Sequence, residues 1–444
     1  MISSLAHYAD FLLVGPFVLI IGISAILTII SRGVQFRALG IAATIIKQTW
    51  RRTINSNISL PPLSALAMAM STTIGIGNMV GPIVAIGYGG PGTLIGFVLG
   101  TILGSATTFT EVVLSIMYRK VRPDGSISGG PMEYLREEMG AAWAWIYAFF
   151  GFLLLVAWSS SQSNTLAILL QPHNINPAIA GLVLASMVLF ILMRGISWIG
   201  RLSEILVPIM FLMYGGTTLW IIIQNAEKLP DVCRLVWSSF FTPNMLLGAT
   251  TGIGMSQVIR WGFARAVQTN EIGTGTGTFA HSITTATPTA QAALATIAIY
   301  TNGVLCVLSG LVILITDAWR VPGAVFDITM FTKILTEYYG PWGNVLLTTC
   351  AFMFAFGTIL GNCYNGSQCF LYVTENRWIN VYYFVTALSV FLGAIAKVSV
   401  VWSIVDYFVI PVAVPHIIAL LIIALRRPSI FKLDIDTTRM SKGK

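Results

Sequence analysis

The sequence predicts an all-α polytopic membrane protein of about eleven transmembrane helices, and three observations support this fold class. The chain is 56% hydrophobic and 9% charged, with a mean hydropathy of +0.81, whereas soluble domains carry roughly 25% charged residues. Apolar runs such as 92–117 and 143–170 exceed the roughly 20 residues that cross the hydrocarbon. Two further apolar segments are interrupted by glycines and small polar residues, at 72–79 and 250–257.

The expected spans form one extra helix followed by two units of five helices. The first span is too long, and its N-terminal flank too poor in basic residues, for a cleaved signal peptide. Because five is an odd number, the two units run in opposite directions, which is inverted-repeat topology. Spans 2 and 7 each begin a unit and carry the interruptions, so we expect both helices to be discontinuous. The expected spans are 11–30, 63–86, 93–117, 142–170, 176–193, 202–224, 244–270, 288–316, 342–372, 379–396 and 400–425.

These spans make up a single transmembrane domain. It consists of the extra helix with a basic inner loop (1–60), a first repeat (61–226), a second repeat (243–425) and a basic cytoplasmic tail (426–444). The inner loop is expected to lie along the membrane surface. The outer loops 227–243 and 317–340 contain apolar residues at mixed spacing and are expected to form short capping helices.

The distribution of Lys and Arg predicts the orientation, because cytoplasmic loops are enriched in these residues. With the N-terminus outside, 20 of the 25 basic residues fall on the inner side, among them Arg260 and Arg265. We therefore expect an external N-terminus and a cytoplasmic C-terminus in the inner (plasma) membrane. The net charge of +8 is spread over short loops, so it reflects topology and argues against nucleic-acid binding. The five cysteines show no CxxC or CxxH spacing, so no disulfide framework or metal site is expected.

The two interrupted segments are the candidate binding site. A helix that is broken at mid-membrane frees backbone groups, and its half-helix ends suit a carboxylate at the N-terminus and a cation at the C-terminus. The alternative is that the glycines let helices pack closely, but two such segments at matched positions, with Asn and Gln beside them, favour a binding site. The candidate substrate ligands there are Thr72, Thr73, Gly75, Gly77 and Asn78 in the first unit, and Gly252, Gly254, Ser256 and Gln257 in the second.

Several ordered motifs, spread from about residue 60 to 425, resemble those of the alanine or glycine:cation symporters, which have a LeuT-type fold. No single motif is decisive, but their number and order make the resemblance specific. The motifs are 75–81 (GIGNMVG), 89–92 (GGPG), Glu111 with Tyr118-Arg119, 129–132 (GGPM), Arg265 with 270–275 (NEIGTG), 354–361 (FAFGTILG), and Trp402 with Asp406.

The resemblance implies a secondary transporter, not an enzyme, that works as a monomer without an organic cofactor. It implies uptake of a small neutral amino acid driven by sodium, or sometimes by protons. Gln162 matches a family position that faces the substrate, although such a carboxamide also serves to bond neighbouring helices. The cation is expected beside Thr73, Gly75, Gly357 and Thr358.

Three departures from the family pattern concern this site. The family usually has Ser-Thr where this chain has Gly357-Thr358, so one hydroxyl is missing, and either the sodium site is weaker or the coupling ion is a proton. The family's pocket Trp is replaced by Asn362, which changes the size and polarity of the pocket. Where the family often has an Asp in its eighth span, this chain has Thr301-Asn302. A distinct substrate preference is therefore expected.

Ionisable residues inside a membrane call for a functional hypothesis. Glu111 is expected to pair with an arginine or to gate the inner side, and Glu271 is expected to form an inner-gate ion pair with Arg265. Asp406 is the candidate for proton coupling, whereas His416 is expected to be packed and hydrogen-bonded.

Other functions remain open at this stage. They are a proton-coupled or uncoupled permease for a different amino acid or small polar solute, and a sensor on the same fold that no longer transports. A channel would show pore loops or rings of charge, and an enzyme would show a nucleophile with a paired base; we find neither pattern in the sequence.

Overall fold

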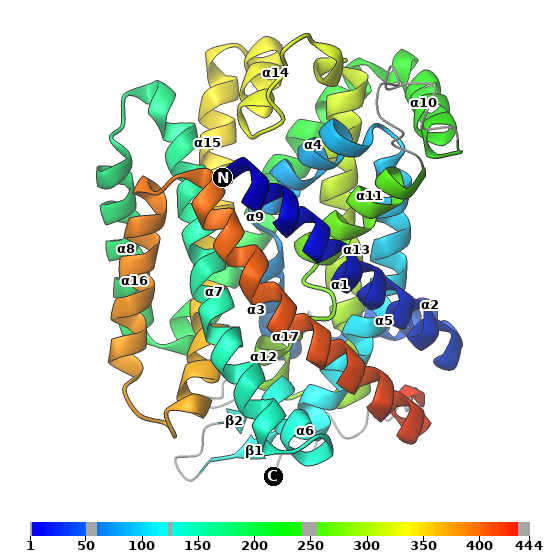
Figure 1. The fold of residues 1–444 in the computed structure, drawn as a ribbon, viewed down its shortest axis with the longest axis vertical. Coiled ribbons are helices and arrows are strands. Elements are labelled where there is room, and N and C mark those ends of the chain that lie inside the picture. The colour runs from blue at the N-terminus through cyan, green and yellow to red at the C-terminus, as the bar shows by residue number, and fades with distance from the viewer. Residues whose placement is uncertain (1, 50–59, 123–126, 242–254, 434–444) are drawn as a thin grey trace.

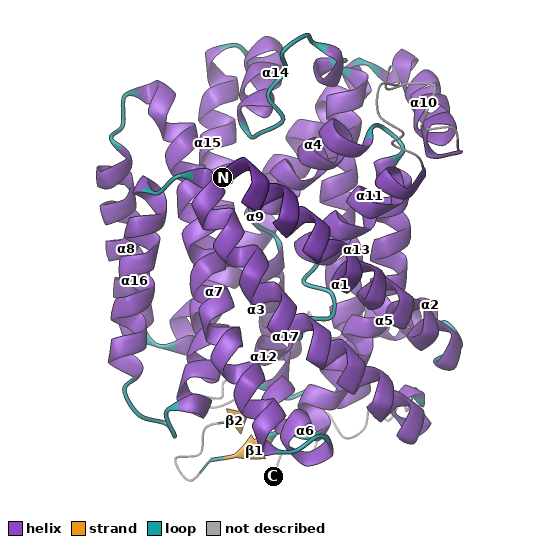
Figure 2. Cartoon of the chain, in the orientation of Figure 1, coloured by secondary structure: helices purple, strands orange, loops and turns teal. Residues whose placement is uncertain are grey.

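The computed structural model describes residues 2–49, 60–122, 127–241 and 255–433, and nearly all of them are helical (Figures 1 and 2). The first half contains α1 (Ile2–Ile30), α2 (Val34–Thr49), α3 (Pro62–Thr73), α4 (Gly77–Gly89), α5 (Thr93–Met117), β1 (Lys120–Val121), β2 (Ile127–Ser128), α6 (Pro131–Glu138), α7 (Ala141–Leu170), η1 (Gln171–His173), α8 (Pro177–Arg194), α9 (Ile196–Gln224), η2 (Ala226–Lys228) and α10 (Leu229–Phe241). The second half contains α11 (Met255–Thr269), α12 (Thr278–Ser282), α13 (Pro288–Ile315), η4 (Ala318–Arg320), α14 (Thr329–Tyr339), α15 (Pro341–Val373), α16 (Ile379–Ile395), α17 (Val398–Arg426) and η5 (Pro428–Phe431).

The predicted spans coincide with described helices or helix pairs. Within the described ranges, seven helices are long and apolar enough to cross a membrane, and two bent pairs raise the number to nine. The remaining two predicted spans correspond to α11 and α16, whose described lengths are 15 and 17 residues. The outer loops 227–243 and 317–340 contain the helices α10 and α14, which confirms the prediction of short helices there.

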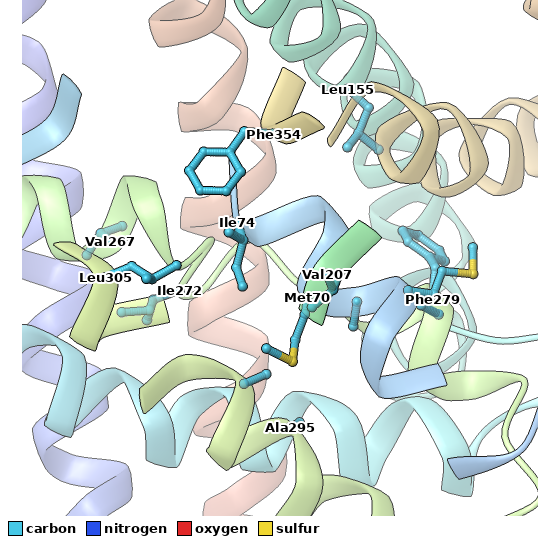
Figure 3. Packing of buried hydrophobic residues seen from close by; sticks show 14 of the residues in the cluster. Met70, Ile74, Leu155, Val207, Val267, Ile272, Phe279, Ala295, Leu305 and Phe354 are labelled. Atoms are coloured by element: carbon cyan, nitrogen blue, oxygen red, sulfur yellow. The ribbon is translucent and has the colours of Figure 1, made fainter. Parts of the chain in front are cut away.

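Span 2 is discontinuous, as predicted. Helix α3 ends because Ile74 adopts an extended conformation (φ −85°, ψ 90°), and α4 begins three residues later at Gly77. The two halves are bent by 42° relative to each other. Figure 3 shows Ile74, at this break, among buried apolar side chains such as Phe354 and Ile272.

Span 7 is also discontinuous: it is interrupted at 270–277, whereas most of the predicted break at 250–257 lies outside the described residues. Helix α11 runs to Thr269, and Glu271, Gly273 and Gly275 then adopt positive φ angles of 52°, 78° and 72°. A right-handed helix cannot contain such angles, and glycine accepts them without steric cost. Of the residues predicted to form this break, Gly252 and Gly254 lie outside the described residues, as do the side chains of Ser256 and Gln257.

The later break changes which half of the molecule α11 occupies. Helix α11 packs against α4, α5 and α10 towards the end of the molecule that carries α14, whereas α12 packs against α3 in the other half (Figure 1). Arg260 and Arg265, which the charge pattern places on the inner side, both lie on α11 and line a cavity with Phe326 and Asp327 of the loop 317–340, which the same pattern places on the outer side. These two expectations conflict. If these two arginines are counted on the outer side, eighteen basic residues fall on the inner side and seven on the outer side. Basic residues therefore remain in excess on the inner side.

Long helices surround the two broken ones. Helix α15 packs along α7, α13 packs along α5, and α17 lies against α1 and α7. The hairpin of β1 and β2, in which Lys120 pairs with Ser128, lies with α6 at the end opposite to α14 (Figure 2). This frame holds the two breaks in the interior of the molecule.

Candidate functional site

A cavity of about 380 Å³ lies between the two broken helices. It extends from the break in span 2 to Phe326 and Asp327, which precede α14, and so it runs toward the outer-loop end of the molecule. The predicted site residues that line it are Thr72, Thr73, Gly75, Gly77, Asn78, Gln162, Arg265, Glu271, Thr358, Asn362 and Asp406. The fold therefore brings together most of the described residues that the sequence marked out.

Gln162 holds the break in span 2. Its Oε1 accepts a hydrogen bond of 3.1 Å from the backbone N–H of Ile76, which has left the helical ladder. At Gly75 a Cβ atom would lie 2.7 Å from Thr358 Oγ1 and 3.1 Å from Gln162 Oε1, so only glycine fits there. The predicted helix-bonding role of Gln162 is thus present, and its place in the cavity wall leaves the ligand role as a prediction.

A chain of buried asparagines joins the two breaks. Asn78 Nδ2 donates to Asn302 Oδ1, and Asn302 Nδ2 donates to Asn270 Oδ1 at 2.7 Å and to the carbonyl of Thr269 at 2.8 Å. These three asparagines are at most 2% exposed. Asn302 appeared in the sequence only as a departure from the family pattern, because a contact between residues 224 positions apart leaves no local signal.

Oxygen atoms gather at the C-terminal end of α3. The Thr358 hydroxyl donates to the carbonyls of Ser71 (3.1 Å) and Ile74 (3.3 Å). The end of a helix where carbonyls are exposed carries partial negative charge, and such carbonyls coordinate cations in transporters. Thr73 lines the cavity, but its hydroxyl lies 3.4 Å from the carbonyls of Ala69 and Met70 in its own helix. Gly357 is not among the residues that line the cavity.

Asn362 supplies an amide without a protein partner. It is completely buried and lines the cavity, and neither its Oδ1 nor its Nδ2 has a hydrogen-bond partner among the described residues. Leaving a buried amide unpaired costs about 1–3 kcal/mol per group. This side chain can therefore bind a polar group of a molecule in the cavity.

Aromatic and charged residues line the outer part of the cavity. The rings of Tyr88 on α4 and Trp261 on α11 stack with their centres 4.8 Å apart, and the Arg265 guanidinium lies 5.4 Å from the Trp261 ring. Arg265 also donates to Gln268 Oε1 at 2.7 Å, and Asp406 lines the same cavity. The outer halves of both broken helices thus contact each other at this rim.

Arg265 lies on α11 and Glu271 lies in the unwound segment that follows it, so their inner-gate pair stays a prediction. The carboxylate of Glu271 accepts a hydrogen bond from the hydroxyl of Thr276, within the unwound segment 270–277. Glu271 is 8% exposed and lies between the main cavity and a second cavity of about 20 Å³.

Glu111 lines the smaller cavity, and the titratable side chain beside it is a histidine in place of the expected arginine. Its Oε1 lies 3.8 Å from Nδ1 of His416. His416 Nδ1 donates to the Gly273 carbonyl at 2.7 Å, and its Nε2 accepts from the Tyr134 hydroxyl at 2.5 Å. His416 is therefore packed and hydrogen-bonded, as predicted, and it fixes the unwound segment of span 7 to α17.

Direct contacts close the half of the molecule that contains α12, which is the expected inner half. Arg119 donates to the carbonyls of Ser282 (3.0 Å), the last residue of α12, and of Thr284 (2.7 Å), which follows it. The backbone of Leu60, which precedes α3, bonds to Ile283 and Thr285 at 2.9 and 3.1 Å. The inner halves α3 and α12 are thus joined to each other and to α5.

Comparisons with known proteins agree with this geometry. The sequence model of the sodium:alanine symporter family matches residues 1–432. A sodium/alanine symporter of Methanococcus maripaludis, AgcS, is 32% identical over 371 residues, which cover 81% of each chain. A probable sodium/glutamine symporter of Bacillus subtilis, GlnT, is 28% identical over 396 residues, which cover 87% of this chain and 80% of that protein.

A solved structure supports the fold independently. A manganese transporter of Eremococcus coleocola superposes with a TM-score of 0.60 at 14% identity, over 86% of this chain and 85% of that one. At this identity the likeness concerns the fold alone, and it agrees with the expected LeuT-type arrangement. The match over nearly the whole sequence identifies this chain as a member of the sodium:alanine symporter family.

Proposed function

We propose that this protein takes up a small neutral amino acid, such as alanine or glycine, together with sodium, by alternating access. The observation that carries the proposal is the cavity between two unwound segments, with the carbonyls of Ser71 and Ile74 and the Thr358 hydroxyl at one corner. Sodium is favoured over a proton because these ligands are neutral oxygen atoms, which bind alkali cations without changing their own protonation.

The two half-helices of span 2 offer complementary ends to the two solutes. The N-terminus of α4 carries partial positive charge and suits the substrate carboxylate, whereas the C-terminus of α3 suits the cation. Because both ends border one cavity, a bound cation strengthens the attraction for the carboxylate. This shared electrostatic field is the physical basis for coupling the two fluxes.

The contacts at the two ends of the cavity suggest how access alternates. Arg119 and Leu60 join the inner halves, while the cavity runs toward the outer-loop end. Transport then requires these inner contacts to break and the outer halves α4 and α11 to close over the cavity. In the predicted orientation, with the N-terminus outside the plasma membrane, this cycle moves substrate inward through a single chain.

A second candidate substrate is an amino acid with a polar side chain. The unpartnered amide of Asn362 favours it, because an apolar side chain would leave both of its polar atoms unsatisfied. A relative that covers most of this chain is named a probable glutamine symporter. Glutamine and asparagine are therefore the first alternatives to alanine and glycine.

Uptake of labelled amino acids into proteoliposomes tests the proposal. Sodium and proton gradients are imposed separately, with alanine, glycine, glutamine and asparagine as substrates and protein-free liposomes as the control. We expect uptake of one of these amino acids above its equilibrium level only with an inward sodium gradient. Accumulation driven by the proton gradient alone would show that the coupling ion is a proton and not sodium. Equal flux with and without the gradients would exclude symport.

A further inference from the structure

The hydroxyl of Ser71 is buried at the end of α3 without a partner. Ser71 is 0% exposed, and its Oγ has no hydrogen bond to any described residue. Serine and threonine hydroxyls inside helices ordinarily bond to a carbonyl one turn earlier, and the neighbouring Thr72 does so, to Ala69 at 2.7 Å. Ser71 thus departs from the behaviour of the next residue, which indicates that its hydroxyl serves another ligand.

The position of this hydroxyl relates it to Gly357 on α15. A Cβ atom built on Gly357 would lie 2.8 Å from Ser71 Oγ. The Ser71 hydroxyl therefore stands where the side chain of a larger residue at position 357 would begin. Gly357 is the position at which the resemblance to the symporters leads one to expect a hydroxyl, and an oxygen from the facing helix lies beside it.

The same corner contains three more oxygen atoms. The Ser71 and Ile74 carbonyls both accept from Thr358 Oγ1. The Ser71 carbonyl is released from the helix because its usual donor, the N–H of Gly75, donates to Asn78 Oδ1 at 3.4 Å. Two carbonyls and the Thr358 hydroxyl thus meet at the negative end of α3, and the Ser71 hydroxyl lies beside Gly357, the residue next to Thr358. Oxygen atoms of this kind bind hard cations.

We propose that the Ser71 hydroxyl is a ligand of the coupling cation and takes the place of the hydroxyl that residue 357 lacks. The inference depends on the proposed sodium coupling and adds to it a ligand on the opposite helix. It also supplies an oxygen ligand beside the position at which Gly357 has no side chain.

The test moves the hydroxyl from one helix to the other. Ser71→Ala removes it, and the double variant Ser71→Ala/Gly357→Ser restores it from α15, in the space that Ser71 has left. We expect Ser71→Ala to raise the sodium concentration for half-maximal uptake by about tenfold, equivalent to about 1.4 kcal/mol. The double variant is expected to return to within about threefold of the native value, on the same scale.

Sodium-dependent thermal stabilisation of the purified protein, measured without substrate, provides a readout independent of transport. The matched control is Ser115→Ala, which removes another fully buried serine hydroxyl, bonded to the carbonyl of Val112 in its own helix at 3.1 Å. Its sodium dependence is expected to equal that of the native protein.

The outcomes separate this inference from the proposed function. If Ser71→Ala depends on sodium as the native protein does, Ser71 is not a ligand of the cation. The same follows if the double variant Ser71→Ala/Gly357→Ser keeps the defect of Ser71→Ala. Both results leave the proposed sodium coupling intact. If neither the uptake nor the thermal stability of the native protein depends on sodium concentration, both the proposed sodium coupling and the role of Ser71 are excluded.

Discussion

Asn302 links the two unwound segments, and its replacement by leucine tests whether that link determines substrate affinity. In Asn302→Leu the branching and the number of non-hydrogen side-chain atoms are unchanged, but three buried groups lose their partner: Asn78 Nδ2, Asn270 Oδ1 and the Thr269 carbonyl. An unsatisfied buried group costs at least about 1 kcal/mol, so the total is roughly 3 kcal/mol. This corresponds to about a hundredfold in an equilibrium constant.

The cost is expected to appear in substrate binding, because Asn78 and Thr269 both line the cavity. We predict that Asn302→Leu weakens alanine or glutamine binding, measured by calorimetry on purified protein, by up to about a hundredfold. The control is Asn225→Ala, which removes another buried asparagine that donates to the Ile221 carbonyl (2.8 Å) and to the Tyr338 hydroxyl (2.7 Å).

Asn225 does not line the cavity, so its loss is expected to lower the melting temperature and to leave affinity unchanged. Both variants remove buried hydrogen bonds of similar length, and they differ in where the unpaired groups lie. If Asn302→Leu binds substrate as tightly as the native protein while its melting temperature falls as in Asn225→Ala, the asparagine chain only stabilises the fold.

Three further predictions concern the cavity and its closure. Gly75→Ala should abolish uptake, because its Cβ would lie 2.7 Å from Thr358 Oγ1, whereas Gly216→Ala, in open space on α9, should transport normally; equal uptake would contradict the close approach. Asn362→Val should reduce the preference for glutamine over alanine in competition assays by about tenfold, and an unchanged ratio would remove the amide from substrate selection. Arg119→Ala should increase hydrogen–deuterium exchange at residues 282–285, with Arg119→Lys intermediate; native exchange would show that Arg119 does not hold the inner half.

Composition and hydropathy were sufficient to predict the membrane-spanning class and the positions of the long helices. The break in span 2 was also predictable, because Gly75 and Gly77 stand directly at the end of α3. The interruption of span 7 at 270–277 was not predicted, since glycines recur both at 250–257 and at 270–277. Only backbone conformation distinguishes a glycine needed for positive φ, as at Gly273, from one needed for close packing.

The interruption at 270–277 also changes where the charged residues of span 7 lie. A break near residue 252 would assign Arg265 and Glu271 to one helix on the inner side, where their opposite charges suggest a pair. With the break after Thr269, Arg265 belongs to the outer half and Glu271 to the unwound segment. Predictions about charged residues in discontinuous helices therefore depend on locating the break before pairing the charges.

The relation between Ser71 and Gly357 shows why a missing side chain cannot be interpreted from its own position. In the sequence, Gly357 is a lost cation ligand, and a weaker site or a different ion follows from it. In the structure, the space beside Gly357 contains an oxygen of residue 71, which is 286 positions earlier in the chain. Because α3 and α15 face each other at this point, an oxygen ligand can come from either helix. Cation binding there depends on the oxygen atoms that the two helices supply together. A loss on one helix then changes ion binding only where the facing helix leaves the space unfilled.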